Sequence, residues 1–129
     1  MYQTNPLLLL ETGYTTDYYK LTIEVHSSDD GRKPHFHVSN TQSGKKRIDC
    51  CIRLDRPEYF LHGKHIYPIK DKEQLDVVIK ELKEKVKSKI INQTVTKWKE
   101  LVLLWNFGNR ERCYTKRIPD YSRLMTTGS

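Results

Sequence analysis

Residues 34–38 read Pro-His-Phe-His-Val, a stretch that puts histidines and apolar residues at alternate positions. Alternation with a period of two is typical of a strand that buries one face. Phe36 and Val38 are then expected to face the core, while His35 and His37 project from the opposite side of the strand. The proline suits the first position of a strand, because its missing N–H costs no ladder hydrogen bond there. We therefore expect a solvent-exposed sheet face that carries both imidazoles.

Segments on either side of this stretch continue the strand pattern. Residues 18–26 and 46–54 alternate apolar and polar side chains, and turn-rich clusters bound them. Residues 59–62 and 65–69 flank a His-Gly pair, whose glycine accepts a positive φ. This last arrangement predicts a tight β-hairpin.

Two amphipathic segments follow the strands and predict helices. Asp71 suits an N-cap position, and apolar residues recur at three- and four-residue steps from Leu75 to Val86. A second helix is expected over residues 94–107, with Gly108 as a natural stop. Strands first and helices afterwards indicate an α+β fold. We expect an antiparallel sheet of four or five strands with two helices packed on one face.

The length of 129 residues predicts a single domain, 1–129. We expect a core over residues 18–108, an irregular lead-in over 1–17 and a basic, partly mobile tail over 109–129. Within the lead-in, Leu7–Leu10 is either a short strand or an apolar segment that docks on the core. This run is far shorter than the roughly 20 residues that a membrane span needs. No basic residue precedes it, so we expect no signal peptide.

Three cysteines, two of them adjacent, do not make an even disulfide framework. Adjacent cysteines rarely bridge each other, because the intervening peptide strains the geometry. We therefore expect reduced thiols in a cytoplasmic protein. Strand alternation divides the adjacent pair into a core thiol, Cys50, and an outward thiol, Cys51, which would lie beside Arg47 and Arg53.

Positive charge is concentrated after residue 30. The net charge is +7, and residues 31–70 carry nine basic against three acidic residues, whereas residues 1–30 carry one lysine against five acidic residues. Such a balance favours polyanionic partners. Cations interleaved with aromatic side chains on a sheet can hold phosphates and stack bases. The candidate binding residues are His35, His37, Arg32, Lys33, Lys46, Arg47, Arg53 and Arg56.

The two histidines also suggest metal chemistry. Side chains two residues apart on a strand lie about 6.5–7 Å apart along the backbone, which suits two ligands of one zinc ion. The possible third ligands are His26, Asp29 or Asp30 in the turn, and Asp49 or Cys51 across the ladder. The pair has no partner at a fixed spacing in the sequence, so we assign neither a metal site nor a cofactor from the pattern.

The same pentapeptide carries a family resemblance. Together with the preceding strand and Asp/Gly turn, the following hairpins, and a Trp-bearing helix that ends near Trp105-Asn106, it resembles domain-of-unknown-function family 4160. These are small bacterial and phage-borne domains, some encoded beside toxin–antitoxin partners. The resemblance covers residues 18–108. It implies a fold and a cellular setting, and it supplies no established activity.

The chain also departs from that family's pattern. Residues 30–33 stand where the family usually has a second proline and an Asp-His pair. The segment after Gly44 is longer than in the family, and the basic tail is additional.

We therefore predict a small cytoplasmic binding domain of phage or mobile-element type. It would engage a nucleic acid or an acidic protein through the basic, His-bearing sheet face. We expect no catalytic residue, because Ser27, Ser28 and Cys51 lie in no recognisable nucleophile motif. The alternative is a metal-dependent hydrolase or nuclease centred on His35 and His37. A third possibility is an inhibitor that covers a host enzyme.

Overall fold

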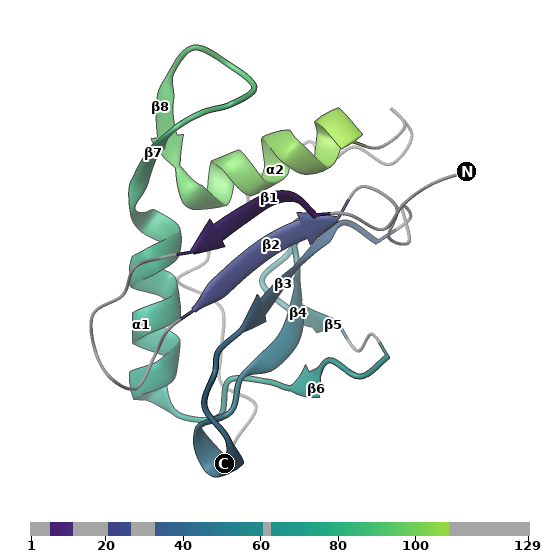
Figure 1. Ribbon diagram of the computed structural model, residues 1–129, viewed down its shortest axis with the longest axis vertical. Coiled ribbons are helices and arrows are strands. Elements are labelled where there is room, and N and C mark those ends of the chain that lie inside the picture. The colour runs from purple at the N-terminus through teal and green to yellow at the C-terminus, as the bar shows by residue number, and fades with distance from the viewer. Residues whose placement is uncertain (1–5, 12–20, 27–32, 61–62, 109–129) are drawn as a thin grey trace.

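The computed structural model describes residues 6–11, 21–26, 33–60 and 63–108. The main sheet is built from β1 (Pro6–Glu11), β2 (Thr22–His26), β3 (His35–Ser39), β4 (Asp49–Arg53), β5 (Tyr59–Phe60) and β6 (Ile66–Tyr67) (Figure 1). These strands are antiparallel in the order β1-β2-β3-β4-β5, and β6 also pairs with β4. The predicted α+β class is confirmed.

The remaining elements are a short 3-10 turn, two helices and a second, two-stranded sheet. They are η1 (Gly44–Lys46), α1 (Lys72–Lys83), β7 (Lys85–Lys87), β8 (Thr94–Thr96) and α2 (Lys97–Gly108). Helix α2 contacts β1, β2 and α1, and β7 and β8 connect the two helices (Figure 1). Both helices bury apolar side chains in one core with the sheet.

The register between strands sets which side chains enter that core. Phe36 lies opposite Ile52, and Val38 lies between Ile23 and Cys50. Phe36 and Val38 are both fully buried, as the alternation predicts. The ring of Phe36 meets Trp98 of α2 edge-on, with 5.1 Å between ring centroids. This aromatic pair fixes α2 against the centre of the sheet.

The predicted helix boundaries are wrong between residues 84 and 96. Helix α1 ends at Lys83, and residues 85–87 and 94–96 form a hairpin in which Val86 faces Val95. Val86 continues the helical stripe in sequence, but it also alternates with two lysines, as a strand residue does. The β-branched residues of the second segment favour the strand.

Two buried glutamates stabilise the junction of the helices and this hairpin. Glu81 of α1 forms an ion pair with the ammonium of Lys97, and both side chains are largely buried. Glu100 of α2 accepts a hydrogen bond of 2.8 Å from the backbone N–H of Lys89. The first contact joins α1 to the start of α2, and the second ties the loop of the hairpin to α2.

The predicted hairpin around Gly63 is also wrong. Tyr59–Phe60 and Ile66–Tyr67 both pair antiparallel with β4, so they run in the same direction along one edge of that strand. The described residues 63–65 form an excursion between the two strands, in which Gly63 has a φ of 60°. Glycine is therefore used as predicted, but within an interrupted strand and not in a hairpin turn.

Two further expectations at the ends of elements have clear outcomes. Asp71 is the N-cap of α1, and its carboxylate accepts a hydrogen bond of 2.8 Å from the backbone N–H of Gln74. Leu7–Leu10 belongs to β1, so the strand interpretation of that run is correct. The predicted tail over 109–129, Arg32 and the turn residues before it lie outside the described residues.

We expect Trp98→Ala to lower the free energy of unfolding by about 3–5 kcal/mol, because it opens a cavity beneath Phe36. Denaturant unfolding measures the change. Phe107→Ala is the matched control from the same helix, since Phe107 is 71% exposed, and it should shift the midpoint little. Equal losses for the two variants would contradict the assignment of Trp98 to the core.

Candidate metal centre

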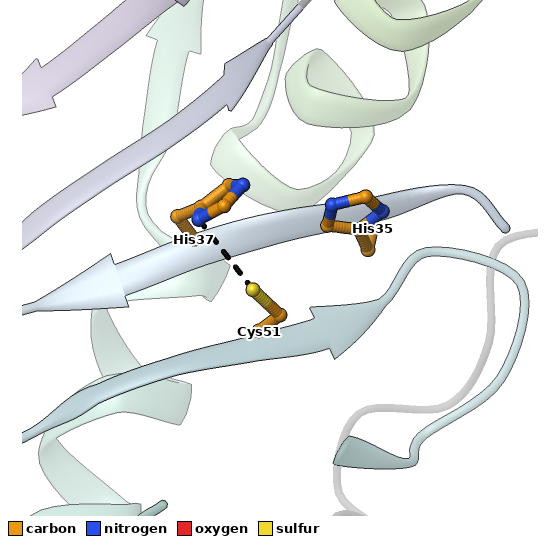
Figure 2. Close-up of side chains that lie close together, drawn as sticks. All are labelled: His35, His37 and Cys51. Atoms are coloured by element: carbon orange, nitrogen blue, oxygen red, sulfur yellow. Dashed lines mark hydrogen bonds between the residues drawn. The ribbon is translucent and has the colours of Figure 1, made fainter. Parts of the chain in front are cut away.

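Strands β3 and β4 bring two histidines and one cysteine together. His35 and His37 occupy alternate positions of β3, and Cys51 of β4 lies directly opposite His37 in the ladder. Cross-strand partners share a face of the sheet, so all three side chains project from the same side. Figure 2 shows His37 and Cys51 facing each other across the two strands.

This side of β3 is buried, contrary to the sequence-based expectation of a solvent-exposed face. His35 is 0% exposed, His37 is 7% exposed and Cys51 is 0% exposed. The rings of Phe60 and Trp105 pack against His35, at centroid distances of 4.9 Å and 5.5 Å. The prediction failed because residues distant in sequence cover this face.

The three side chains form a group that can hold a metal ion. Their ligand atoms all lie within 4.8 Å of one another, and the Cys51 sulfur is 3.4 Å from Nδ1 of His37. In a tetrahedral zinc site, a thiolate at about 2.3 Å and an imidazole nitrogen at about 2.0–2.1 Å lie about 3.5 Å apart. The Cys51–His37 separation therefore already matches that of two ligands of one ion.

A backbone contact fixes which nitrogen of His35 can act as a ligand. Nδ1 of His35 lies 2.6 Å from the carbonyl oxygen of Lys33. A carbonyl only accepts, so Nδ1 carries the proton and donates it. The lone pair of the neutral ring is then on Nε2. Metal-binding histidines commonly donate their other N–H to a backbone carbonyl in this way.

A second polar pair borders the group. His65 packs its ring edge-on against His37 at a centroid distance of 4.8 Å. Nδ1 of His65 lies 2.6 Å from a carboxylate oxygen of Asp49, and Arg47 contacts the other oxygen of that carboxylate at 3.4 Å. No pattern in the sequence indicates this role of His65, because the excursion between β5 and β6 positions the side chain and no fixed spacing marks it.

Cys50 and Cys51 point in opposite directions, as strand alternation predicts. Cys50 is in the apolar core, where burial raises the pKa of its thiol well above the ordinary value. The expectation that Cys51 faces outward beside the arginines is wrong, since Cys51 is buried against His37. Of these two cysteines, Cys51 alone is therefore placed to act as a metal ligand.

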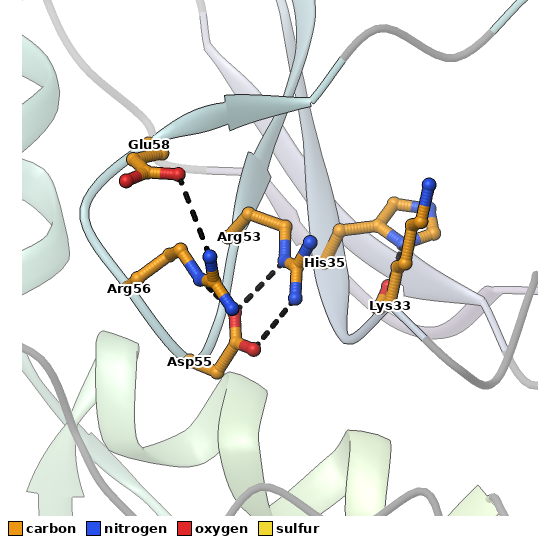
Figure 3. A network of polar contacts seen from close by, with 6 residues as sticks. All are labelled: Lys33, His35, Arg53, Asp55, Arg56 and Glu58. Carbon is orange, nitrogen blue, oxygen red and sulfur yellow. Dashed lines mark hydrogen bonds and ion pairs between the residues drawn. The ribbon is translucent and has the colours of Figure 1, made fainter.

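The predicted basic residues do not join the histidines in one open surface. Arg53 donates to both carboxylate oxygens of Asp55, at 2.8 and 2.6 Å. Arg56 pairs with Asp55 at 3.8 Å and with Glu58 at 3.9 Å (Figure 3). Acidic neighbours thus balance these arginines.

The other predicted cations that the structure describes lie outside the histidine group. Lys33 places its ammonium 5.2 Å from the ring of Phe60, and Arg47 stacks over Tyr67 at 4.0 Å. Lys46 is exposed in η1. The predicted binding residues that the structure describes are therefore divided between a buried histidine group and cations outside it.

No family model, curated protein or solved structure matches this chain. The resemblance to family 4160 therefore stays a prediction. Among the residues that the structure describes, no helix has the length and apolar character that crossing a membrane requires.

We expect nitrogen-resolved NMR of the metal-free protein to show the proton of His35 on Nδ1, because that atom donates to the Lys33 carbonyl. Long-range proton–nitrogen correlation of the imidazole distinguishes the two tautomers. His65, half-exposed and bonded to Asp49 through Nδ1, provides an internal comparison. A His35 ring protonated on Nε2 alone would contradict the assignment.

Proposed function

We propose that this protein is a metal-stabilised binding domain, in which His35, His37 and Cys51 hold one zinc ion. The observation that carries the proposal is the convergence of two imidazoles and one thiol, from adjacent strands, on one buried point. Mixed nitrogen and sulfur donors suit zinc, whereas magnesium and calcium require oxygen ligands. To reach tetrahedral spacing, the distance between any two of the three ligand atoms needs to shorten by at most roughly 1.4 Å.

Burial supports a structural role for the ion over hydrolysis. A catalytic zinc site also has three protein ligands, but its fourth position is open to water or substrate. All three side chains of this group are at most 7% exposed. The hydrolase or nuclease reading, centred on His35 and His37, is therefore the weaker of the two. A structural ion would join β3 to β4, and its binding energy would add to the stability of the fold.

We expect purified protein to contain about one zinc ion per chain by elemental analysis. Cys51→Ala should abolish stoichiometric zinc, because it removes the thiolate ligand. Cys50→Ala is the matched control, since the neighbouring thiol lies on the opposite face, and it should keep the metal. Zinc absent from the parent protein, or retained equally by both variants, would refute the proposal.

We expect removal of the metal to lower the thermal midpoint of unfolding. A ligand at 100 times its dissociation constant stabilises the folded state by about 2.7 kcal/mol. Calorimetry with and without a strong chelator measures the shift, and the Cys51→Ala variant should show none. If the chelator lowered the thermal midpoint of the parent protein and of Cys51→Ala by the same amount, the shift would not come from this centre and the prediction would be wrong.

The exposed cations around η1 support a polyanionic partner as a second candidate function. Lys45 and Lys46 are exposed in η1, and the neighbouring Arg47 is stacked on Tyr67 with 42% of its side chain exposed. Stacking holds the guanidinium in place while leaving N–H groups for phosphate or carboxylate oxygens. These cations would form the contact with a nucleic acid or an acidic protein segment.

We expect Lys46→Glu combined with Arg47→Glu to weaken binding of a single-stranded RNA probe. If each cation contacts a phosphate, the slope of log affinity against log salt should fall in magnitude by about 1.4. Lys80→Glu combined with Lys83→Glu makes the same charge change on exposed positions of α1 and should bind like the parent. Equal losses in both would indicate an effect of net charge alone. An acidic peptide, tested in parallel, distinguishes the protein partner.

A further inference from the structure

The proposed zinc ion has three ligands in the group described above, and a closed tetrahedral site needs a fourth. His65 is the remaining histidine whose side chain the structure describes. Its ring is in edge-on contact with His37, 4.8 Å between centroids, so it borders the group directly. It comes from the excursion between β5 and β6, on the edge of β4 that lies away from β3.

The hydrogen bond of His65 prepares its ring for ligation. An ionised carboxylate only accepts, so Nδ1 of His65 donates to Asp49 across the 2.6 Å contact. The lone pair of the neutral ring is then on Nε2. A carboxylate on the far nitrogen fixes the ring orientation and raises the basicity of the ligating nitrogen. His65 and His35 thus share one arrangement, in which Nδ1 donates to an oxygen and Nε2 carries the lone pair of the ring.

Asp49 is itself held in position. It lies in β4 opposite Ser39 of β3, and its second oxygen contacts Arg47, whose guanidinium stacks on Tyr67. The carboxylate is 21% exposed, so it is partly screened from water. This chain of contacts runs from an exposed arginine inward to the His37 ring. It supports the orientation of His65 without placing Asp49 among the ligands.

The exposure of His65 also places it on a path by which an ion could enter the site. Its side chain is 37% exposed, whereas the other three are almost completely buried. A buried metal site needs an entry path, and the half-exposed histidine is where this group meets solvent. An ion arriving from water would meet His65 first.

We propose that His65 is the fourth ligand and closes the centre as one thiolate with three imidazoles, while Asp49 acts as a positioning residue. This inference rests on the proposed zinc centre and makes it a closed, structural site. It also predicts that the ion has four protein ligands, one sulfur and three nitrogens.

X-ray absorption of the zinc-loaded protein tests the donor count. We expect one sulfur at about 2.3 Å and three imidazole nitrogens at about 2.0–2.1 Å. His65→Ala should leave one sulfur and two imidazoles, with a water-derived oxygen, and should weaken zinc binding at least tenfold. Asp49→Asn should keep the donor set and weaken binding about 10–100-fold, as loss of an outer partner does.

His65→Cys keeps the test decisive if the alanine variant folds poorly. With cobalt(II) as the probe, a second thiolate should raise the sulfur-to-metal charge-transfer absorbance about twofold over the parent. Lys64→Ala, an exposed neighbour in the same excursion, is the control and should match the parent in affinity and spectrum. Circular dichroism checks the fold of each variant.

The outcomes separate the two proposals. A parent protein that binds no metal refutes the zinc centre, and this inference with it. Zinc bound with unchanged affinity and donor count in His65→Ala leaves the three-residue centre standing and overturns the role of His65. An unchanged cobalt spectrum in a folded His65→Cys protein overturns it as well.

Discussion

The register between β3 and β4 is the constraint on which the rest of the structure depends. One alignment places Phe36 opposite Ile52 and, on the other face, His37 opposite Cys51. Because side chains alternate, a slip by one residue would send the histidines into the apolar core and the phenylalanine out of it. The same register therefore builds the helix-covered core and collects the polar donors.

Strands β3 and β4 are buried on both faces, so they bury polar side chains as well as apolar ones. Burying an imidazole or a thiol is costly unless each polar atom finds a partner. The Lys33 carbonyl and the Cys51–His37 contact supply some of those partners within the described chain. A bound ion would be a partner for His35, His37 and Cys51 at once. The proposed metal would therefore account for the burial of these three polar side chains.

Strands and helices follow from the sequence where a segment fits one periodicity alone. Alternation around Phe36 and the capping residue Asp71 both led to correct elements. Val86 fitted a helical and a strand period equally, and its pairing with Val95, nine residues away, decided the outcome. Local periodicity cannot contain that information, because it comes from a contact between segments.

The same limit applies to the site. Alternation correctly placed both histidines and Cys51 on one side, and Cys51 was among the possible third ligands. It could not show that this side is covered, because the covering rings of Phe60 and Trp105 come from β5 and from the far end of α2. Nor could it join His65 to Asp49, since the interrupted pairing along β4 brings them together.

Asp49 links the buried histidine group to the exposed Arg47 through polar contacts. Its carboxylate contacts Arg47 through one oxygen and His65 through the other. Arg53 forms an ion pair with Asp55, and Arg56 forms one with Glu58, so each of these arginines has an acidic neighbour within the chain. Arg47 differs from these two arginines, because its partner Asp49 also accepts a hydrogen bond from His65. The proposed polyanion contact and the proposed metal centre therefore share one carboxylate, and a change in either one alters the electrostatic surroundings of the other.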